Sequence, residues 1–318
     1  KLFYILNYAF KYLIPPNYPN LLFPISATPL LNSSRLLFQQ NKMIIQLTVV
    51  ALAMVSGYIE PAWKYLLENT DEYPMIVGGM FVSLVGGYFL GAIPYTILDM
   101  LRIPAIEKYK VQQGRYPTTK ELIKITWDLI LLFVLVMLPM IAIGAPIFKY
   151  FGMTRDMPLP SWKAVIIQVL FFFVVEDYMN YWFHRWLHTP WAYKAIHAVH
   201  HENDAPFALS ATYAHPIEVI LLGIPTFTGP ILVGPHLLTL WIWLMMRQYE
   251  AIDIHSGYEF PWSINAVFKL YAGTEHHDYH HHMYSGNFAS IFTWCDKLYD
   301  TNLGYDVFKQ KQAIAKVE

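Results

Sequence analysis

The sequence has 318 residues, of which 55% are hydrophobic, 17% aromatic and only 14% charged. Soluble domains carry about 25% charged residues, so this composition indicates an integral membrane protein, and the mean hydropathy of +0.31 agrees. The formal net charge of −1 gives no electrostatic basis for binding nucleic acid. The single cysteine, Cys295, excludes an internal disulfide and a thiolate metal site.

Residues 1–42 are apolar, but prolines interrupt them repeatedly. This pattern predicts an N-terminal interfacial segment of short helices or loops. A signal peptide is not expected, because no small-residue cleavage site follows an apolar core. No polar linker divides the rest of the chain, so we expect residues 43–318 to form a single membrane-embedded domain.

Four apolar runs predict helices that cross a membrane, since a crossing needs about 20 mostly apolar residues. Between the first two runs, residues 60–74 carry one lysine and four acidic residues, whereas 99–124 carry six basic and three acidic residues. By the positive-inside rule, 99–124 therefore lies on the cytosolic side. The predicted spans are 43–59, 75–98, 129–148 and 164–175, the last prolonged to about residue 180.

Eight histidines form three clusters in the second half of the chain. Spacings of three and four residues place side chains on one face of a helix, where their ring nitrogens can converge. Eight imidazoles are too many for one ion, so the pattern predicts two metal ions held close together. The clusters are His184 and His188; His197, His200 and His201; and His277, His280 and His281.

Imidazole ligands are compatible with zinc, copper, iron and nickel. Structural zinc sites are usually four-coordinate and often rich in cysteine, which three cysteine-free clusters do not match. We therefore expect a pair of iron ions that binds O2 and oxidises an unactivated C–H bond. The surrounding membrane helices would bring a lipid to this site.

Residues 219–246 form a further run without Lys, Arg, Asp or Glu, interrupted by Pro and Gly near its middle. A single crossing would put the third histidine cluster on the opposite side of the membrane from the first two. A shared metal site forbids this, so we predict a helical hairpin that enters and returns to the same side. The expected fold is thus an all-α integral membrane bundle of about four spanning helices plus this hairpin, with a cytosolic helical cap that holds the two-metal site. His236, isolated inside this run, is expected to be structural.

Other polar residues near the clusters are candidates to complete the site. His215 and His255 flank the hairpin on the predicted metal side, so we expect both to be ligands, which raises the number to ten. His276 and His282 are expected in the surroundings or at the surface, because not all five histidines of 276–282 can face one point. Carboxylates that can accept the second ring N–H of a ligand are Asp177, Glu202, Glu218, Asp253 and Asp278.

Two other classes of protein remain as alternatives. A divalent-metal transporter would hold its ligands at the membrane midplane on broken helices with acidic residues. The clusters instead lie in polar stretches outside the long apolar runs. A haem protein would need two axial ligands and would leave most of the histidines unexplained.

The three clusters, in this order and after several membrane helices, resemble those of the fatty acid hydroxylase / sterol desaturase superfamily of integral-membrane diiron enzymes. Within it, the chain most resembles the C-4 methylsterol monooxygenases, also called sterol 4-alpha-methyl oxidases. The segments that carry this resemblance are 176–185, 212–218, 247–258, 260–262 and the tail 286–299.

The resemblance implies an enzyme of sterol biosynthesis that oxidises a sterol C-4 methyl group to alcohol, aldehyde and carboxylate. It implies O2 as oxidant, electrons from NAD(P)H through cytochrome b5, and the other sterol C-4 demethylation enzymes as partners. It further implies the endoplasmic reticulum membrane, a cytosolic metal site and the eight clustered histidines as iron ligands. A sterol C-5 desaturase or a fatty-acid or lipid hydroxylase is the alternative, because the histidine clusters are shared across the superfamily.

Overall fold

The computed structural model of the protein describes residues 57–315. The chain divides into two compact units, residues 1–63 and 64–318. In the first unit, the described residues 57–63 are helical. The predicted interfacial segment 1–42, its boundary with the rest of the chain and most of the predicted span 43–59 lie outside the described residues and stay predictions.

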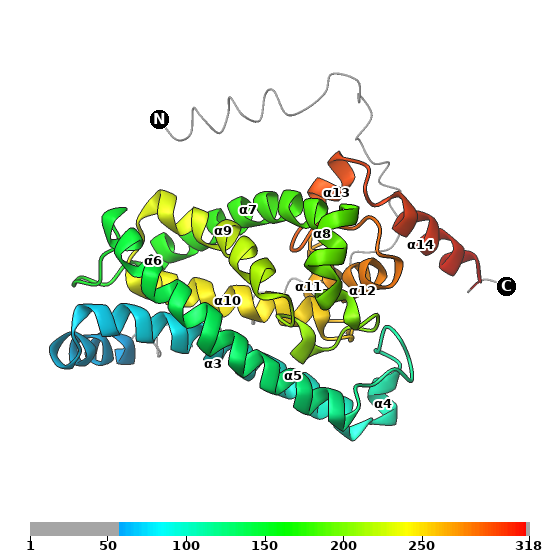
Figure 1. Ribbon diagram of the computed structural model, residues 1–318, viewed down its shortest axis with the longest axis horizontal. Coiled ribbons are helices and arrows are strands. Elements are labelled where there is room, and N and C mark those ends of the chain that lie inside the picture. The colour runs from blue at the N-terminus through cyan, green and yellow to red at the C-terminus, as the bar shows by residue number, and fades with distance from the viewer. Residues whose placement is uncertain (1–56, 316–318) are drawn as a thin grey trace, which may run out of the picture. The chain divides into compact units, whose positions relative to one another are not determined.

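In the described part of the second unit, residues 64–315, the regular secondary structure is entirely helical, with isolated β-bridges but no strand. This confirms the expected all-α architecture. Two long helix pairs organise the unit, α3 with α10 and α7 with α9 (Figure 1). The elements are α3 (Glu72–Leu101), α4 (Pro104–Glu107), α5 (Thr119–Leu132), the π-helical η1 (Phe133–Met137), α6 (Leu138–Tyr150), α7 (Trp162–Leu187), α8 (Pro190–Ala195), the 3-10 helices η2 (His197–Glu202) and η3 (Ala208–Ser210), α9 (Pro216–Val233), α10 (Leu237–His255), α11 (Ile264–Val267), α12 (Gly273–Met283), α13 (Trp294–Leu298) and α14 (Leu303–Ala315).

Glycines on α3 allow α10 to approach closely. A Cβ atom at Gly87 would lie 3.1 Å from the Cα of Met245, and one at Gly79 would overlap the ring of Trp241. Small residues at such points let helix backbones pack against each other in membrane proteins. The close contact fixes the position of α10, which ends at His255.

Three helices of the described part are long and apolar enough to cross a membrane. They are α3, the continuous helix Thr119–Tyr150 that joins α5, η1 and α6, and α9. The predicted spans 75–98 and 129–148 fall within the first two. The predicted span 164–180 lies within the single helix α7, which is not among the three, and its Glu176 and Asp177 are fully buried in the protein.

The run 219–246 forms the predicted hairpin from α9 and α10. Gly234, with φ +59°, and Pro235 separate the two helices, and the indole N–H of Trp243 donates to the carbonyl of Thr226 at 3.0 Å to join them. His236 caps α10 by accepting from the N–H of Leu238 at 3.1 Å, which is a structural role. The first turn of α9 and the last turn of α10 both lie at the histidine clusters.

Candidate metal centre

Nine histidines gather into two groups, in each of which one ring nitrogen per residue lies within 4.8 Å of the others. They come from α7 and its C-cap residue His188, and from η2, α10 and α12, so four separate parts of the chain build the centre. Two of the sequence clusters are divided between the groups. The first group is His184, His188, His197, His201 and His280, and the second is His200, His255, His277 and His281.

In the first group, Nε2 atoms face one another at short range. Nε2 of His197 lies 3.1 Å from that of His184, 3.1 Å from that of His188 and 3.2 Å from that of His201. Nε2 of His188 lies 3.1 Å from that of His280. Two nitrogens bound at right angles to one ion with bonds of about 2.1 Å would be roughly 3.0 Å apart. The spacing therefore fits neighbouring ligands of one metal ion.

The second group shows the same arrangement. Nε2 of His255 lies 3.2 Å from that of His200 and 3.0 Å from that of His277. Both nitrogens of His281 are buried without a hydrogen-bond partner in the described part of the protein. A buried imidazole without a partner is costly unless another group, such as a metal ion, binds it. The ring centroids of His201, in the first group, and His281, in the second, are 4.5 Å apart, so the two groups are adjacent.

Backbone carbonyls orient most of these rings. When Nδ1–H donates to a carbonyl, the proton is fixed on that nitrogen and Nε2 presents its lone pair to the centre. Sequence reasoning missed these acceptors, because a backbone carbonyl has no sequence signature. The bonds run from Nδ1 of His184 to Phe288 (2.8 Å), His188 to Tyr284 (3.1 Å), His200 to Tyr213 (3.1 Å), His255 to Ala251 (2.7 Å) and His280 to Gly286 (2.7 Å).

One carboxylate orients a further ring. Nδ1 of His197 lies 2.8 Å from Oε1 of Glu218, one of the five predicted carboxylates. The structure does not bring the other four to a clustered histidine, because each accepts from groups elsewhere. Asp177 accepts from the N–H groups of Ile291 and Phe292, Glu202 from the Tyr213 hydroxyl, Asp253 from the hydroxyls of Tyr95 and Tyr271, and Asp278 from the Gln112 amide.

Besides His236, three more histidines lie outside both groups. His215, predicted as a ligand together with His255, caps α9 through its Nδ1, which accepts from the N–H of Ile217 at 3.2 Å. The structure therefore brings His255 to the centre but not His215. His276 is buried 3.6 Å from the Asp296 carboxylate, and His282 is exposed.

Burial keeps the clustered rings neutral. Loss of hydration lowers the pKa of His188 and of His200 to about 4, because it disfavours the charged imidazolium. Burial likewise lowers the pKa of His277, and the nearby ring of His255 adds to this effect. Metal binding requires the neutral form. The donor set and its spacing thus fit two transition-metal ions.

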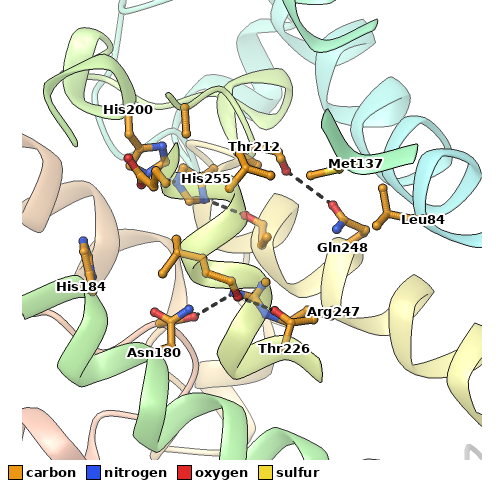
Figure 2. A pocket seen from close by; sticks show the side chains of 18 of the residues that line it. Leu84, Met137, Asn180, His184, His200, Thr212, Thr226, Arg247, Gln248 and His255 are labelled. Carbon is orange, nitrogen blue, oxygen red and sulfur yellow. Dashed lines mark hydrogen bonds between the residues drawn. The ribbon is translucent and has the colours of Figure 1, made fainter. Parts of the chain in front are cut away.

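A pocket connects the membrane helices with both groups (Figure 2). Its walls are apolar side chains of α3, η1, α6, α9 and α10, such as Leu84, Met137 and Leu222. Its cavity volume is about 150 Å³. Apolar pockets with a few polar groups are typical sites for small organic ligands. The histidines that line it are His184 and His197 of the first group and His200, His255 and His277 of the second.

Comparison with known proteins identifies the family. Methylsterol monooxygenase 2-2 of Arabidopsis thaliana is 40% identical over 255 residues, which cover 79% of this chain and 94% of that protein. Very-long-chain aldehyde decarbonylase GL1-8 of Oryza sativa subsp. japonica is 41% identical over the same shares of the two chains. GL1-10, a very-long-chain aldehyde decarbonylase from the same source, is 42% identical over 84% of this chain and 89% of its own.

No solved structure gives a significant match. The model of the family described as fatty acid hydroxylase matches residues 169–301, the part of the chain that carries all nine grouped histidines. With relatives of about 40% identity over most of their length, the chain belongs to the fatty acid hydroxylase family of membrane enzymes, a group of non-haem iron oxygenases.

Proposed function

We propose that this protein is a methylsterol monooxygenase, which oxidises a C-4 methyl group of sterol precursors stepwise to alcohol, aldehyde and carboxylate. The observation that carries the proposal is the pocket that leads from the apolar membrane helices to both histidine groups. A flat apolar molecule with one small polar end matches this distribution of side chains. Relatives named as methylsterol monooxygenases support the same substrate class.

Each part of the chain has a distinct task in this reaction. The nine grouped histidines would hold two iron ions, which, when bound, supply the O2 chemistry needed to oxidise an unactivated C–H bond. The carbonyls and Glu218 keep six Nε2 atoms directed inward. Leu84, Met137 and the other apolar wall residues exclude water and orient the lipid.

Each hydroxylation consumes O2, two electrons and two protons, so the protein needs an electron donor. We propose NAD(P)H through cytochrome b5 and its reductase, on the cytosolic face of the endoplasmic reticulum membrane, beside other sterol C-4 demethylation enzymes. The positively charged segment 99–124 supports this orientation. Its Gln112 donates to Asp278 on α12 at 3.0 Å, and its Arg115 pairs with Asp204 at 2.6 Å, so it lies on the same side as the histidines.

Decarbonylation of a very-long-chain aldehyde is the second candidate. Relatives named as very-long-chain aldehyde decarbonylases match this chain at 41–42% identity, as closely as the methylsterol monooxygenases do. An extended aldehyde would fill the same apolar pocket. It would place a carbonyl group at the histidines, where a sterol would place a methyl group and a neighbouring hydroxyl.

Membranes that contain the protein, NADH, cytochrome b5 and its reductase test the proposal. We expect a 4,4-dimethylsterol to yield the C-4 hydroxymethyl, aldehyde and carboxylate products by mass spectrometry, and the His200→Ala variant to yield none. Shortening of a very-long-chain aldehyde with no sterol oxidation would identify the second candidate instead. Sterol oxidation that survives in the His200→Ala variant would contradict the assignment of the metal centre.

A further inference from the structure

Three polar side chains lie on one wall of the pocket beside the histidines and do not belong to either metal group. They are Asn180, Arg247 and Ser290, all of which line the pocket. Asn180 precedes His184 by four residues on α7, so the two side chains are neighbours on one helix face. Figure 2 shows Asn180 and Arg247 on the wall next to His184. In a pocket whose walls are mostly apolar, such a group points to a polar part of the substrate.

Two buried carboxylates hold Arg247 in place. Its Nε donates to Oε1 of Glu176 at 2.7 Å, and its Nη1 donates to Oε2 of Glu250 at 2.7 Å. Its Nη2 donates to Oγ of Ser290 at 3.2 Å. Arginine can only donate, so the Ser290 oxygen is the acceptor and its own proton is available for a second partner. The network thus presents a hydroxyl donor to the pocket.

Asn180 presents the complementary group. Its Nδ2 donates to Oε1 of Glu176 at 3.3 Å. Because a carboxylate oxygen only accepts, the amide nitrogen must face Glu176, and Oδ1 is the atom that Asn180 offers to the pocket. Asn180 is 4% exposed and Ser290 is 6% exposed, so a polar substrate group that reaches them leaves water behind. Such a group must find its hydrogen bonds here.

An alcohol donates one hydrogen bond and accepts another, which matches this pair of side chains. Its O–H can donate to Oδ1 of Asn180, and its oxygen can accept from Oγ–H of Ser290. In a 4-methylsterol the 3-hydroxyl is on the carbon next to C-4. A hydroxyl held one helical turn from His184 therefore leaves the C-4 methyl group facing the histidines. An aldehyde has no O–H to donate to Asn180.

We propose that Asn180 and Ser290 form a hydroxyl-binding subsite that selects substrates with a hydroxyl on the carbon adjacent to the one oxidised. This inference rests on the proposed function and names the specificity determinant within it. Arg247 acts through Ser290 as a positioning residue. The subsite also gives a reason for the buried charges of Glu176, Arg247 and Glu250, which neither metal group uses.

The test compares a 4,4-dimethylsterol with its 3-deoxy analogue in the wild type and in three variants. Asn180→Leu and Ser290→Ala each remove one partner of the hydroxyl. Gln248→Leu is the matched control, since Gln248 is a polar pocket residue that lies apart from this network and pairs with Thr212. The readouts are kcat/KM for both substrates, binding of radiolabelled sterol to the purified protein, and iron content as a measure of intact folding.

We expect the wild type to prefer the 3-hydroxy substrate by roughly tenfold to a hundredfold, the range expected when a missing hydroxyl leaves buried polar groups unsatisfied. Asn180→Leu and Ser290→Ala should reduce this preference to about threefold or less, with the 3-deoxy rate and the iron content retained. Sterol binding should weaken in parallel. Gln248→Leu should keep the preference.

Several outcomes would overturn the subsite. If Asn180→Leu and Ser290→Ala slow both substrates equally, their role is structural; if Gln248→Leu alone removes the preference, the hydroxyl binds elsewhere. If the wild type oxidises both substrates equally, the subsite is refuted while the proposed function stands. If it oxidises and binds neither, both fall. If Asn180→Leu does not fold, the substrate preference of Ser290→Ala tests the subsite by itself, because this substitution removes only one hydroxyl group.

Discussion

Nδ1 of His197 and Oε1 of Glu218 are 2.8 Å apart, and both side chains are almost completely buried, at 1% and 2% exposure. Glu218 lies in the first turn of α9, one of the three helices able to cross a membrane. This contact therefore joins the membrane hairpin directly to the first histidine group. It fixes the ring of His197, whose Nε2 faces those of three other histidines.

Replacing Glu218 should weaken metal binding without removing a ligand. We expect Glu218→Gln to lower iron affinity by about 10- to 100-fold, because loss of the partner loosens the ring and reduces its basicity. Iron retained after dialysis against a graded series of chelator concentrations measures this. Glu202→Gln is the control, since Glu202 is exposed and accepts from Tyr213 rather than from a histidine. Equal iron retention in both variants would contradict the role of Glu218.

His255 and His215, which flank the same hairpin, should behave differently on substitution. His255→Ala removes a member of the second group and should lose most of the bound iron and at least about 100-fold of the activity. His215→Ala removes only a helix cap, at a cost of about 0.5–2 kcal/mol, and should keep about two irons per chain. Metal analysis with a thermal melt separates the two effects. If His215→Ala loses iron, and a variant with another helix-capping residue at this position does not regain it, His215 is a ligand.

Removal of the metal should destabilise the protein. A ligand present at 1,000 times its dissociation constant adds about 4 kcal/mol to the folded state, which for a chain of this length corresponds to roughly 6 °C in Tm. We expect a chelator to lower Tm by this amount in detergent and ferrous iron to restore it. The double variant His280→Ala/His281→Ala, which loses one ligand from each group, should show no response to either. An unchanged Tm in the wild type would argue against a metal-supported fold.

The buried ion pair between Lys110 and Asp99 should matter for stability. Nζ of Lys110 lies 2.7 Å from Oδ1 of Asp99, both side chains are at most 3% exposed, and the hydroxyl of Tyr258 also donates to Asp99 at 2.9 Å. Lys110→Met leaves a buried carboxylate without its cation, so we expect a loss of about 3–5 kcal/mol.

Denaturant titration in mixed micelles measures the free energy of unfolding of this variant. The exposed pair of Arg115 and Asp204 provides the control, because its side chains are 55% and 42% exposed. Arg115→Met should cost less than about 1 kcal/mol. Similar losses in the two variants would mean that burial does not strengthen the interaction of Lys110 with Asp99.

Local spacing was sufficient to predict the helical class and the two membrane spans 75–98 and 129–148. These features depend on the period of one helix or on the length of one apolar run, and both can be counted along the sequence. The hairpin at 219–246 needed a further argument, namely that all three histidine clusters must lie on one side of the membrane to share a metal site. The third histidine cluster shows the limit of such counting. His277, His280 and His281 have the spacing of one shared site, yet His280 joins the first group and its two neighbours join the second.

The sequence by itself predicted that many imidazoles of a membrane protein would converge outside its long apolar runs, since spacing sets the direction of side chains on each helix. Only the tertiary structure decided which rings meet, because this depends on how α7, η2, α10 and α12 are placed against one another. Close packing of Met245 on Gly87 carries His255 to the centre, while His215 is held at the start of α9. Folding also brings the carbonyls of Tyr284, Gly286 and Phe288 to the rings, contacts between residues up to 104 positions apart that no local pattern records.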